Sequence, residues 1–581
     1  MVDLASLRAE LYAAASTLSD LNLYHAAKWA SEALNGLAHV DQAFDFGPPP
    51  VAAHDQHDHF RVVLAKTYFN CKEFERAAHV LKDCSSGNAL FVKLYATYIS
   101  VDKKSAEDSG GFMNLGVAPG VVGGGVSGHA GPADDATERR KDLADGLSGR
   151  LATIVSEIEA FHQRPGASPN AFLLFLEGII YTKRKRFELA QELLVASLKV
   201  FPYNWSCWQE LLSTFSTYDD AAAFLEQIKA TAPDLAAGVM FQIFDIVLLQ
   251  EFYQQSPGFH DKINHLTEIL PNFVFLKVQK FLVAYHGLDY FQAESLFDEI
   301  LINDPMRLDD LDTYSNMLYV MEKKSKLAFL AQYTSQIDKF RSETCCVIAN
   351  YHSMKGEHDK SVMYYKRALT LNKNCLSAWT LMGHEFVELK NSHAAIESYR
   401  RAVDINSKDF RAWYGLGQAY EVLDMHLYAL YYYQRATNLQ PSDKRMWQAI
   451  GNCYEKIDKL NEAISSFEKA LAIETMNRVG EDAADSSNVE PHICYKLAII
   501  SEKLGKAKET YKYMRLCFEQ EFDWGVTDET SKARLWLARY SLENRNYEDA
   551  YELAKDFNFS NAHDVEEARA IAKEARSRMS N

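Results

Sequence analysis

The sequence lacks the features that mark membrane-spanning, secreted and nucleic-acid-binding proteins. No apolar run approaches the length that crosses a membrane, and the best candidate, Met240–Gln250, is interrupted by Asp245. The N-terminal stretch MVDLASLRAELYAAAS reads as an amphipathic helix and not as a signal peptide. The formal net charge of −17 argues against nucleic acid as a partner, because binding to phosphates requires an excess of Lys and Arg. We therefore expect a soluble protein with no membrane and no nucleic-acid partner.

Disulfide frameworks and catalytic motifs are also missing. The nine cysteines include no Cys-x-x-Cys pair, which is typical of a reduced, intracellular protein whose thiols pack as small apolar groups. The sequence contains no Gly-x-Ser-x-Gly, no His-Glu-x-x-His and no kinase signature. Strand patterns are almost absent, and with them the strand-end loops that usually carry such motifs. We expect no enzymatic activity from this chain alone.

One cluster of potential metal ligands occurs, in the stretch HDQHDH. It contains His54, His57 and His59 with Asp55 and Asp58, and imidazole and carboxylate groups at such spacing can hold a transition metal. The cluster follows three prolines and reads as a loop, without partner ligands elsewhere in the sequence. Metal binding is the less favoured interpretation, so the sequence predicts no metal and no cofactor.

A pattern of large and small residues repeats through the C-terminal half. Trp379, Trp413 and Trp447 are 34 residues apart and begin the same series each time. The series runs Gly383, Phe386, Ala395, Tyr399 and Ala402, then Gly417, Tyr420, Ala429, Tyr433 and Ala436, then Gly451, Tyr454, Ala463, Phe467 and Ala470. This is the tetratricopeptide repeat (TPR), a pair of antiparallel helices that is stable only when stacked with others. The sequence therefore predicts an all-α fold, a TPR superhelical solenoid of antiparallel helix pairs.

The residue types of the repeat have packing reasons. We expect Gly383, Gly417 and Gly451 to let the two helices of each repeat approach closely. The rings of the repeat then fill the wider gaps beside that contact. An aromatic stripe at helical spacing indicates a core, so we interpret the three tryptophans as packing residues and not as part of a cofactor site.

Weaker copies of the pattern extend toward both ends of the chain. We divide the chain into N-terminal repeats (1–270), C-terminal repeats with a groove (271–560) and a C-terminal tail (561–581). The glycine-rich stretch at about 102–137 predicts a disordered insertion, because it contains little that can pack. The acidic stretch around 480–490 predicts a second insertion on the surface.

The first helix of each repeat lines the concave face of a TPR solenoid. With each tryptophan taken as the fourth residue of its repeat, the groove-facing positions carry amides, acids and aromatic rings, which suits a bound peptide. A clamp for a C-terminal carboxylate would need several Lys and Arg, and only Arg411 and Arg445 approach that. We expect a partner with positive charge. The candidate binding residues are Asn316, Tyr319, Asn350, His384, Glu385, Tyr414, Gln418 and Glu421.

Stretches of the chain resemble one family beyond the spaced repeat positions. They are AWTLMGHEFVELKN, RAWYGLGQAYEVL and LYYYQRATNLQPSD, with TYSNMLYV and IANYHS upstream and NWSCWQELL in the N-terminal half. They are similar to subunit eight of the anaphase-promoting complex, the cell-division-cycle-23 type. The strong match covers about residues 305–460. A generic TPR protein would match only at the spaced positions.

The resemblance implies a non-catalytic scaffold subunit of a multisubunit ubiquitin ligase that drives exit from mitosis, present in the nucleus and cytoplasm. It implies stacking with other TPR subunits and a homodimer formed by the N-terminal repeats. The apolar run Phe172–Tyr181 is more than the core of one repeat needs, which agrees with a dimer. It also implies that the C-terminal groove receives the basic N-terminal box of WD40-type coactivators.

Two residues carry the sharpest expectation for that groove. The amide of Asn350 is placed to bond the backbone of a bound peptide, and Glu385 to pair with an arginine of the coactivator box. Tyr319, Tyr414 and Gln418 are the expected walls for an apolar residue of the box. The alternative function is a chaperone adaptor that binds C-terminal peptides, and the missing basic residues count against it.

Overall fold

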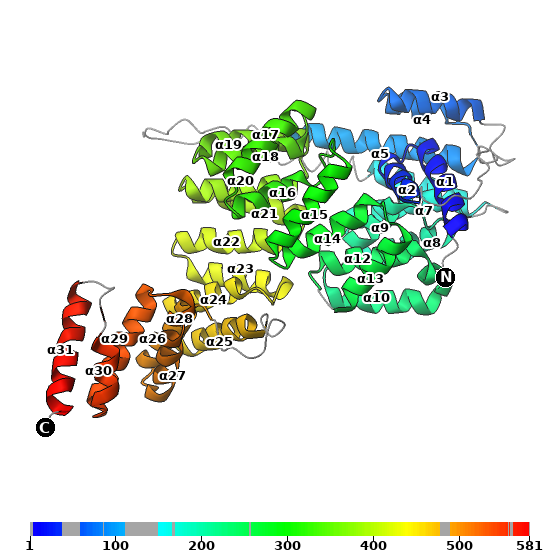
Figure 1. Ribbon diagram of the computed structural model, residues 1–581. Helices are drawn as coiled ribbons and strands as arrows, with labels where there is room; N and C mark the ends of the chain where they lie inside the picture. Colours follow the sequence, from blue (N-terminus) through cyan, green and yellow to red (C-terminus); the bar gives the residue numbers. More distant parts are fainter. Residues whose placement is uncertain are drawn as a thin grey trace, which may run out of the picture. The chain divides into compact units, whose positions relative to one another are not determined.

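The computed structural model of the chain consists of helices in the parts that it describes (Figure 1). These parts are residues 4–37, 59–84, 86–110, 149–164, 169–254, 257–476, 489–555, 557 and 562–579. The chain divides into two compact units, Met1–Asn303 and Asp304–Asn581. Both units contain successive antiparallel helix pairs, which confirms the predicted TPR fold. Among the described helices, none combines the length and apolar character that a membrane span requires.

The helices of the N-terminal unit pair in sequence order, α1 with α2, α3 with α4, α7 with α8 and α14 with α15. Their bounds are α1 Leu4–Asp20, α2 Tyr24–Gly36, α3 His59–Asn70, α4 Phe74–Val80, α5 Gly87–Gly110, α7 Ala171–Lys183, α8 Phe187–Val200, α9 Trp205–Ser213, α10 Tyr218–Thr231, α11 Pro233–Ala237, α12 Val239–Glu251, α13 Pro257–Ile269, α14 Val274–His286 and α15 Tyr290–Asn303. A further helix spans residues 149–162.

An aromatic cluster joins the first repeat of this unit to later helices. Trp29 of α2 stacks on Trp205 of α9 with ring centroids 4.7 Å apart, and Phe273 and Phe275 meet it edge-on. The apolar run on α7 is buried within the same chain from Phe172 to Ile180. It therefore presents no free apolar face, because α5 and α9 of neighbouring repeats contact α7 as well as its partner α8.

The helices of the C-terminal unit follow the predicted repeat closely. Their bounds are α16 Leu311–Val320, α17 Lys324–Ile337, α18 Ser342–Met354, α19 His358–Leu371, α20 Leu376–Glu388, α21 Ser392–Ile405, α22 Phe410–Val422, α23 His426–Leu439, α24 Lys444–Lys456, α25 Leu460–Met476, α26 Pro491–Lys503, α27 Ala507–Glu519, α28 Glu521–Trp524, α29 Asp528–Glu543, α30 Tyr547–Lys555 and α31 Ala562–Met579. First helices of successive repeats contact one another, as α16, α18, α20 and α22 do in turn. Second helices such as α21 pack between two first helices, here α20 and α22.

The predicted glycine contacts are confirmed at a fully buried tyrosine. A Cβ on Gly383 would lie 2.5 Å from Cε1 of Tyr399, and a Cβ on Gly415, in the next first helix, 2.4 Å from the same atom. Only residues without a side chain allow this ring to lie between two repeats. The same contact recurs between Gly417 and Tyr433 (2.4 Å) and between Gly451 and Phe467 (2.7 Å).

The repeat tryptophans donate hydrogen bonds in addition to packing. The prediction from the sequence, which gave them a packing role alone, did not include these bonds. Their rings stay partly exposed, and each indole N–H donates to a carbonyl in the turn that precedes its helix. Each bond therefore ties the start of a first helix to the end of the previous repeat. The pairs are Trp379 to Lys373 (2.9 Å), Trp413 to Ser407 (2.8 Å), Trp447 to Pro441 (2.9 Å) and, in the N-terminal unit, Trp208 to Pro202 (2.8 Å).

Several predicted boundaries differ from the structure. The unit boundary falls after Asn303 and not after residue 270. α5 continues to Gly110, so the first part of the expected insertion at 102–137 is helical, and the rest lies outside the described residues. The expected C-terminal tail contains α31, whose buried Ala568 and Ile571 pack in a cluster with α29 and α30. The apolar pattern at the end of the chain is too short to predict this packed helix from the sequence.

Two other predicted features lie mostly outside the described residues. Of the HDQHDH cluster only His59 is described, as the first residue of α3. The acidic insertion is described only at its end, Val489 and Glu490. In the described part of the chain, no group of three His, Cys, Asp or Glu side chains is placed to hold a metal ion.

Candidate peptide-binding groove

The amide of Asn350 is hydrogen-bonded at both ends inside the protein. Asn350 on α18 is 2% exposed. Its Nδ2 donates to Oγ of Ser315 on α16 at 2.7 Å, and its Oδ1 accepts from the hydroxyl of Tyr365 on α19. The prediction that the Asn350 amide is free to bond a peptide backbone is therefore wrong. Asn350 instead links three helices beneath the groove, because its polar atoms satisfy buried partners.

Glu385 is likewise not the free carboxylate that the sequence suggested. It is 5% exposed, and its Oε2 lies 2.8 Å from Nδ1 of His358, at the start of α19. Its negative charge adds to burial in raising the pKa of both Tyr365 and Tyr399 above the ordinary range. The carboxylate thus acts on two tyrosine hydroxyls through its charge and is paired with a histidine of its own chain.

His384, one residue earlier, faces a different set of groups. Its Nδ1 is hydrogen-bonded to the hydroxyl of Tyr399 at 2.7 Å. Burial, followed by the positive charge of Arg411, lowers the pKa of His384 to about 4. The imidazole is therefore neutral near pH 7 and contributes a hydrogen-bonding group without charge to the groove.

The remaining predicted residues on α22 lie together. Glu421 accepts a hydrogen bond from the hydroxyl of Tyr433 at 2.6 Å, and the ring of Tyr414 lies 5.3 Å from that of Tyr433. Burial raises the pKa of Tyr414, and Gln418 lies beside its hydroxyl. On α16, Tyr319 is 38% exposed and Asn316 is partly buried.

The sequence interpretation missed the hydroxyls that organise this lining. Tyr365, Tyr399 and Tyr433 come from second helices, and their spacing of 34 residues indicated only packing. Each hydroxyl reaches a groove-facing residue of the preceding first helix. The choice of tyrosine was the sequence feature that could have predicted these bonds. A buried ring that only fills space can be Phe, as at Phe467, so a buried Tyr indicates a partner for its hydroxyl.

Cations at the groove are neutralised by carboxylates of their own helices. Nε of Arg411 lies 3.0 Å from Oδ1 of Asp409, and Nη2 of Arg445 lies 2.8 Å from Oδ2 of Asp443. Both aspartates are buried caps that also accept from the backbone N–H of those arginines. The two basic residues that approached a carboxylate clamp are therefore held in place and charge-balanced.

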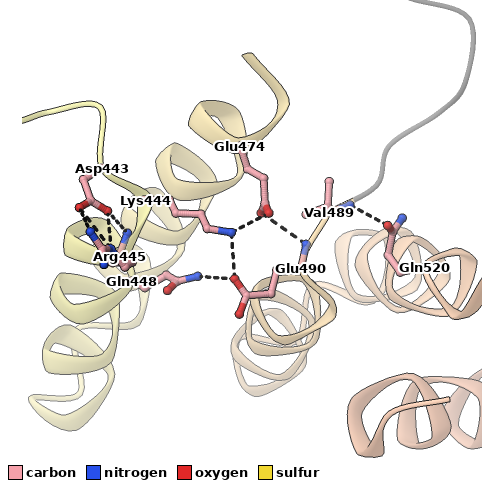
Figure 2. Close-up of polar contacts among 8 residues, drawn as sticks. All are labelled: Asp443, Lys444, Arg445, Gln448, Glu474, Val489, Glu490 and Gln520. Carbon is pink, nitrogen blue, oxygen red and sulfur yellow. Dashed lines mark hydrogen bonds and ion pairs between the residues drawn. The ribbon is translucent and has the colours of Figure 1, made fainter. Parts of the chain in front are cut away.

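A third cation, Lys444 at the start of α24, forms ion pairs with two glutamates (Figure 2). Nζ of Lys444 lies 2.7 Å from Oε1 of Glu474 and 3.1 Å from Oε2 of Glu490. Gln448, at a groove-facing position, donates to Glu490 at 3.3 Å. Beside this network the N–H of Val489 donates to Gln520 at 2.7 Å. The network connects α24 with the end of α25 and the start of α26.

The fold and the polar lining of its first helices define the class of protein, a helical solenoid of TPR repeats whose cations are paired within the chain. Profiles of TPR repeats match residues 383–423, 342–375 and 444–475, and the profile described as anaphase promoting complex subunit 8 / Cdc23 matches residues 6–281. The chain is 41% identical to anaphase-promoting complex subunit CDC23 of Saccharomyces cerevisiae, over 99% of this chain and 98% of that protein. It is 32% identical to anaphase-promoting complex subunit 8 of Arabidopsis thaliana, over 68% of each. The chain belongs to the family of anaphase-promoting complex subunit 8, or Cdc23, as its resemblance predicted.

A solved structure agrees with the fold. The crystal structure of the APC/C hetero-tetramer Cut9-Hcn1 matches with a TM-score of 0.51, covering 90% of this chain and 96% of that chain at 14% identity. At this identity the likeness concerns the helical-repeat fold alone.

Proposed function

We propose that this chain is a non-catalytic scaffold subunit of an anaphase-promoting complex and that its C-terminal groove binds the basic N-terminal box of coactivators. Family membership supports the place in the complex. Stacking with other TPR subunits, formation of a homodimer and residence in the nucleus and cytoplasm belong to the same proposal. The carboxylate-binding chaperone adaptor is the alternative.

The charge balance of the groove is the observation that carries the preference for a basic partner. Arg411, Arg445 and Lys444 each have a carboxylate of this chain within ion-pair distance. A partner's carboxylate would have to compete with these intramolecular pairs, whereas a partner's guanidinium meets an acceptor at the partly buried Glu421. Charge-assisted hydrogen bonds of that kind are roughly twice as strong as neutral ones.

The structure also changes which residues are suitable for a test. Glu385→Lys would bury a cation beside His358, so a loss of binding would not be separable from a loss of folding. Glu421 is only partly buried, and a glutamine there still accepts from Tyr433 while removing the charge. Glu421→Gln is therefore the informative substitution.

We expect Glu421→Gln to weaken binding of a basic-box peptide about tenfold. The substitution removes one charge-assisted hydrogen bond, which contributes about 1.5–3 kcal/mol when buried and less at a partly exposed residue. Calorimetric titration of the full chain with the peptide measures this. Glu397→Gln is the matched control, because Glu397 pairs with Arg401 on the same second helix, α21.

Equal affinities for Glu421→Gln, Glu397→Gln and the unchanged chain would place the box elsewhere. Tight binding of a peptide with an acidic C-terminus, competing with the basic box, would favour the chaperone-adaptor alternative. Circular dichroism on each variant confirms that helicity is unchanged.

A further inference from the structure

A cavity of about 400 Å³ opens between the second helices α23 and α25, over the first helix α24. Its floor includes Trp447 and Tyr454, and polar side chains such as Gln434, Asn438 and Lys469 surround it. By the period of the helix, Trp447 and Tyr454 lie roughly 100° and 120° around the axis of α24 from Gln448, the position predicted to face the groove. The cavity is therefore separate from the groove, and it stands independently of the function proposed above.

The preceding repeat shows what fills the equivalent space. There the floor is made by Trp413 and Tyr420, which stand 34 residues before Trp447 and Tyr454. Tyr432 covers them, with its ring stacked on Tyr420 at 5.2 Å and 8° and on Trp413 at 6.1 Å and 28°. Arg400 closes the arrangement by donating to the Tyr420 hydroxyl at 2.8 Å.

The residue equivalent to Tyr432 in the open repeat is Ser466. Ser466 is 4% exposed, and its hydroxyl is bonded to the backbone carbonyl of Glu462 at 2.9 Å. No ring of its own helix covers the floor at this position. Lys469 lies with Nζ 4.4 Å from the Trp447 ring centroid, and Gln434 donates to the Tyr454 hydroxyl at 3.2 Å.

We propose that this cavity is a binding site for an aromatic side chain, tyrosine by preference, carried by an extended segment of another protein. The bound ring takes the place that Tyr432 occupies one repeat earlier, stacked on Tyr454 and Trp447. A phenol hydroxyl at the rim meets donors and acceptors on Asn438, Gln434 and Lys469. The cavity lies within the size range of small-molecule sites, about 300–1,000 Å³, so the ring and its flanking backbone fit together.

The test fills the site from within the chain. Ser466→Tyr rebuilds the arrangement of the preceding repeat, and Ser398→Tyr places the same substitution at the equivalent position of α21. N-acetyl-L-tyrosinamide is titrated against the full chain by ligand-observed NMR up to about 10 mM, since a single side chain binds only at millimolar concentration. We expect saturable binding to the unchanged chain and to Ser398→Tyr, and at least tenfold weaker binding to Ser466→Tyr.

Three outcomes would overturn the proposal. They are equal binding to Ser466→Tyr, no saturable binding to the unchanged chain, and equal binding of N-acetyl-L-leucinamide. Ser465→Trp, at an exposed position of the rim, blocks the mouth without touching the core and gives the same reading if Ser466→Tyr fails to fold. Light scattering tests whether a second copy of this chain occupies the site. Loss of a dimer in Ser466→Tyr would assign the site to that second copy and would contradict binding of another protein.

Discussion

Glu177 is a carboxyl group in α7, the helix whose residues are buried from Ala171 to Ile180. It is 6% exposed on α7, and burial, with a smaller contribution from the charge of Glu159, raises its pKa to about 7 from an ordinary value of 4.5. The folded state therefore favours the protonated form. Ionised Glu177 destabilises the fold, and this cost is absent below about pH 4.5, grows through pH 7 and is complete above it.

We expect Glu177→Gln to stabilise the protein at pH 8 by up to about 3 kcal/mol, from a pKa shift at 1.36 kcal/mol per unit. At pH 5 the difference between variant and unchanged chain should nearly vanish, because both then carry a neutral group. Urea denaturation at the two pH values measures it. Glu188→Gln, at an exposed position of α8, serves as the control and should show no such dependence. A variant that is equally destabilised at both pH values would contradict the assignment.

Between elements, stability depends on how closely paired helices approach. A Cβ on Gly417 would lie 2.4 Å from the ring of Tyr433, which is buried and bonded to Glu421 and so has little freedom to move. We expect Gly417→Ala to destabilise the C-terminal unit by about 1–3 kcal/mol through overpacking. The drop in melting temperature, followed by circular dichroism, measures this.

Gly258 provides a matched control in a helix. A Cβ there would meet nothing within 4 Å, so Gly258→Ala should be neutral or slightly stabilising, as helix propensity alone predicts. Equal melting temperatures for Gly417→Ala and the unchanged chain would mean that the helices of this repeat separate at little cost.

At the scale of helices, periodicity was sufficient to predict the pairs. Small residues at Gly383 and Ala395 and rings at Tyr399 mark the contact within a repeat, because packing there depends on residues of one local register. Polar partners were not predictable in the same way. Glu385 pairs with His358, and Asn350 with Ser315, across helices whose relative rotation no spacing in the sequence encodes. The positions of the candidate residues on first helices followed from the repeat register, while the partners of their side chains did not.

The whole molecule is proposed to act as a homodimer, and the structure alters the reason for expecting it. The apolar run on α7 is covered by its own chain from Phe172 to Ile180, so the proposal depends on family membership and not on an exposed apolar surface. We expect light scattering at about micromolar concentration to give twice the mass of the 65.9 kDa chain. A monomer under these conditions would contradict the proposal, and a mixture that shifts with dilution would give its dissociation constant.

The three tyrosines that reach the groove from second helices also make the fold easy to modify over evolution. Each ring supplies packing, which is indispensable, and a hydroxyl, which only positions a groove residue. A change of one base in a codon turns Tyr into Phe, which removes the hydroxyl and keeps the ring. Phe467 occupies the equivalent position of the next repeat and has the ring alone. Related chains can therefore differ in the polar groups that their first helices present, one repeat at a time, while the helices that present them keep the same packing.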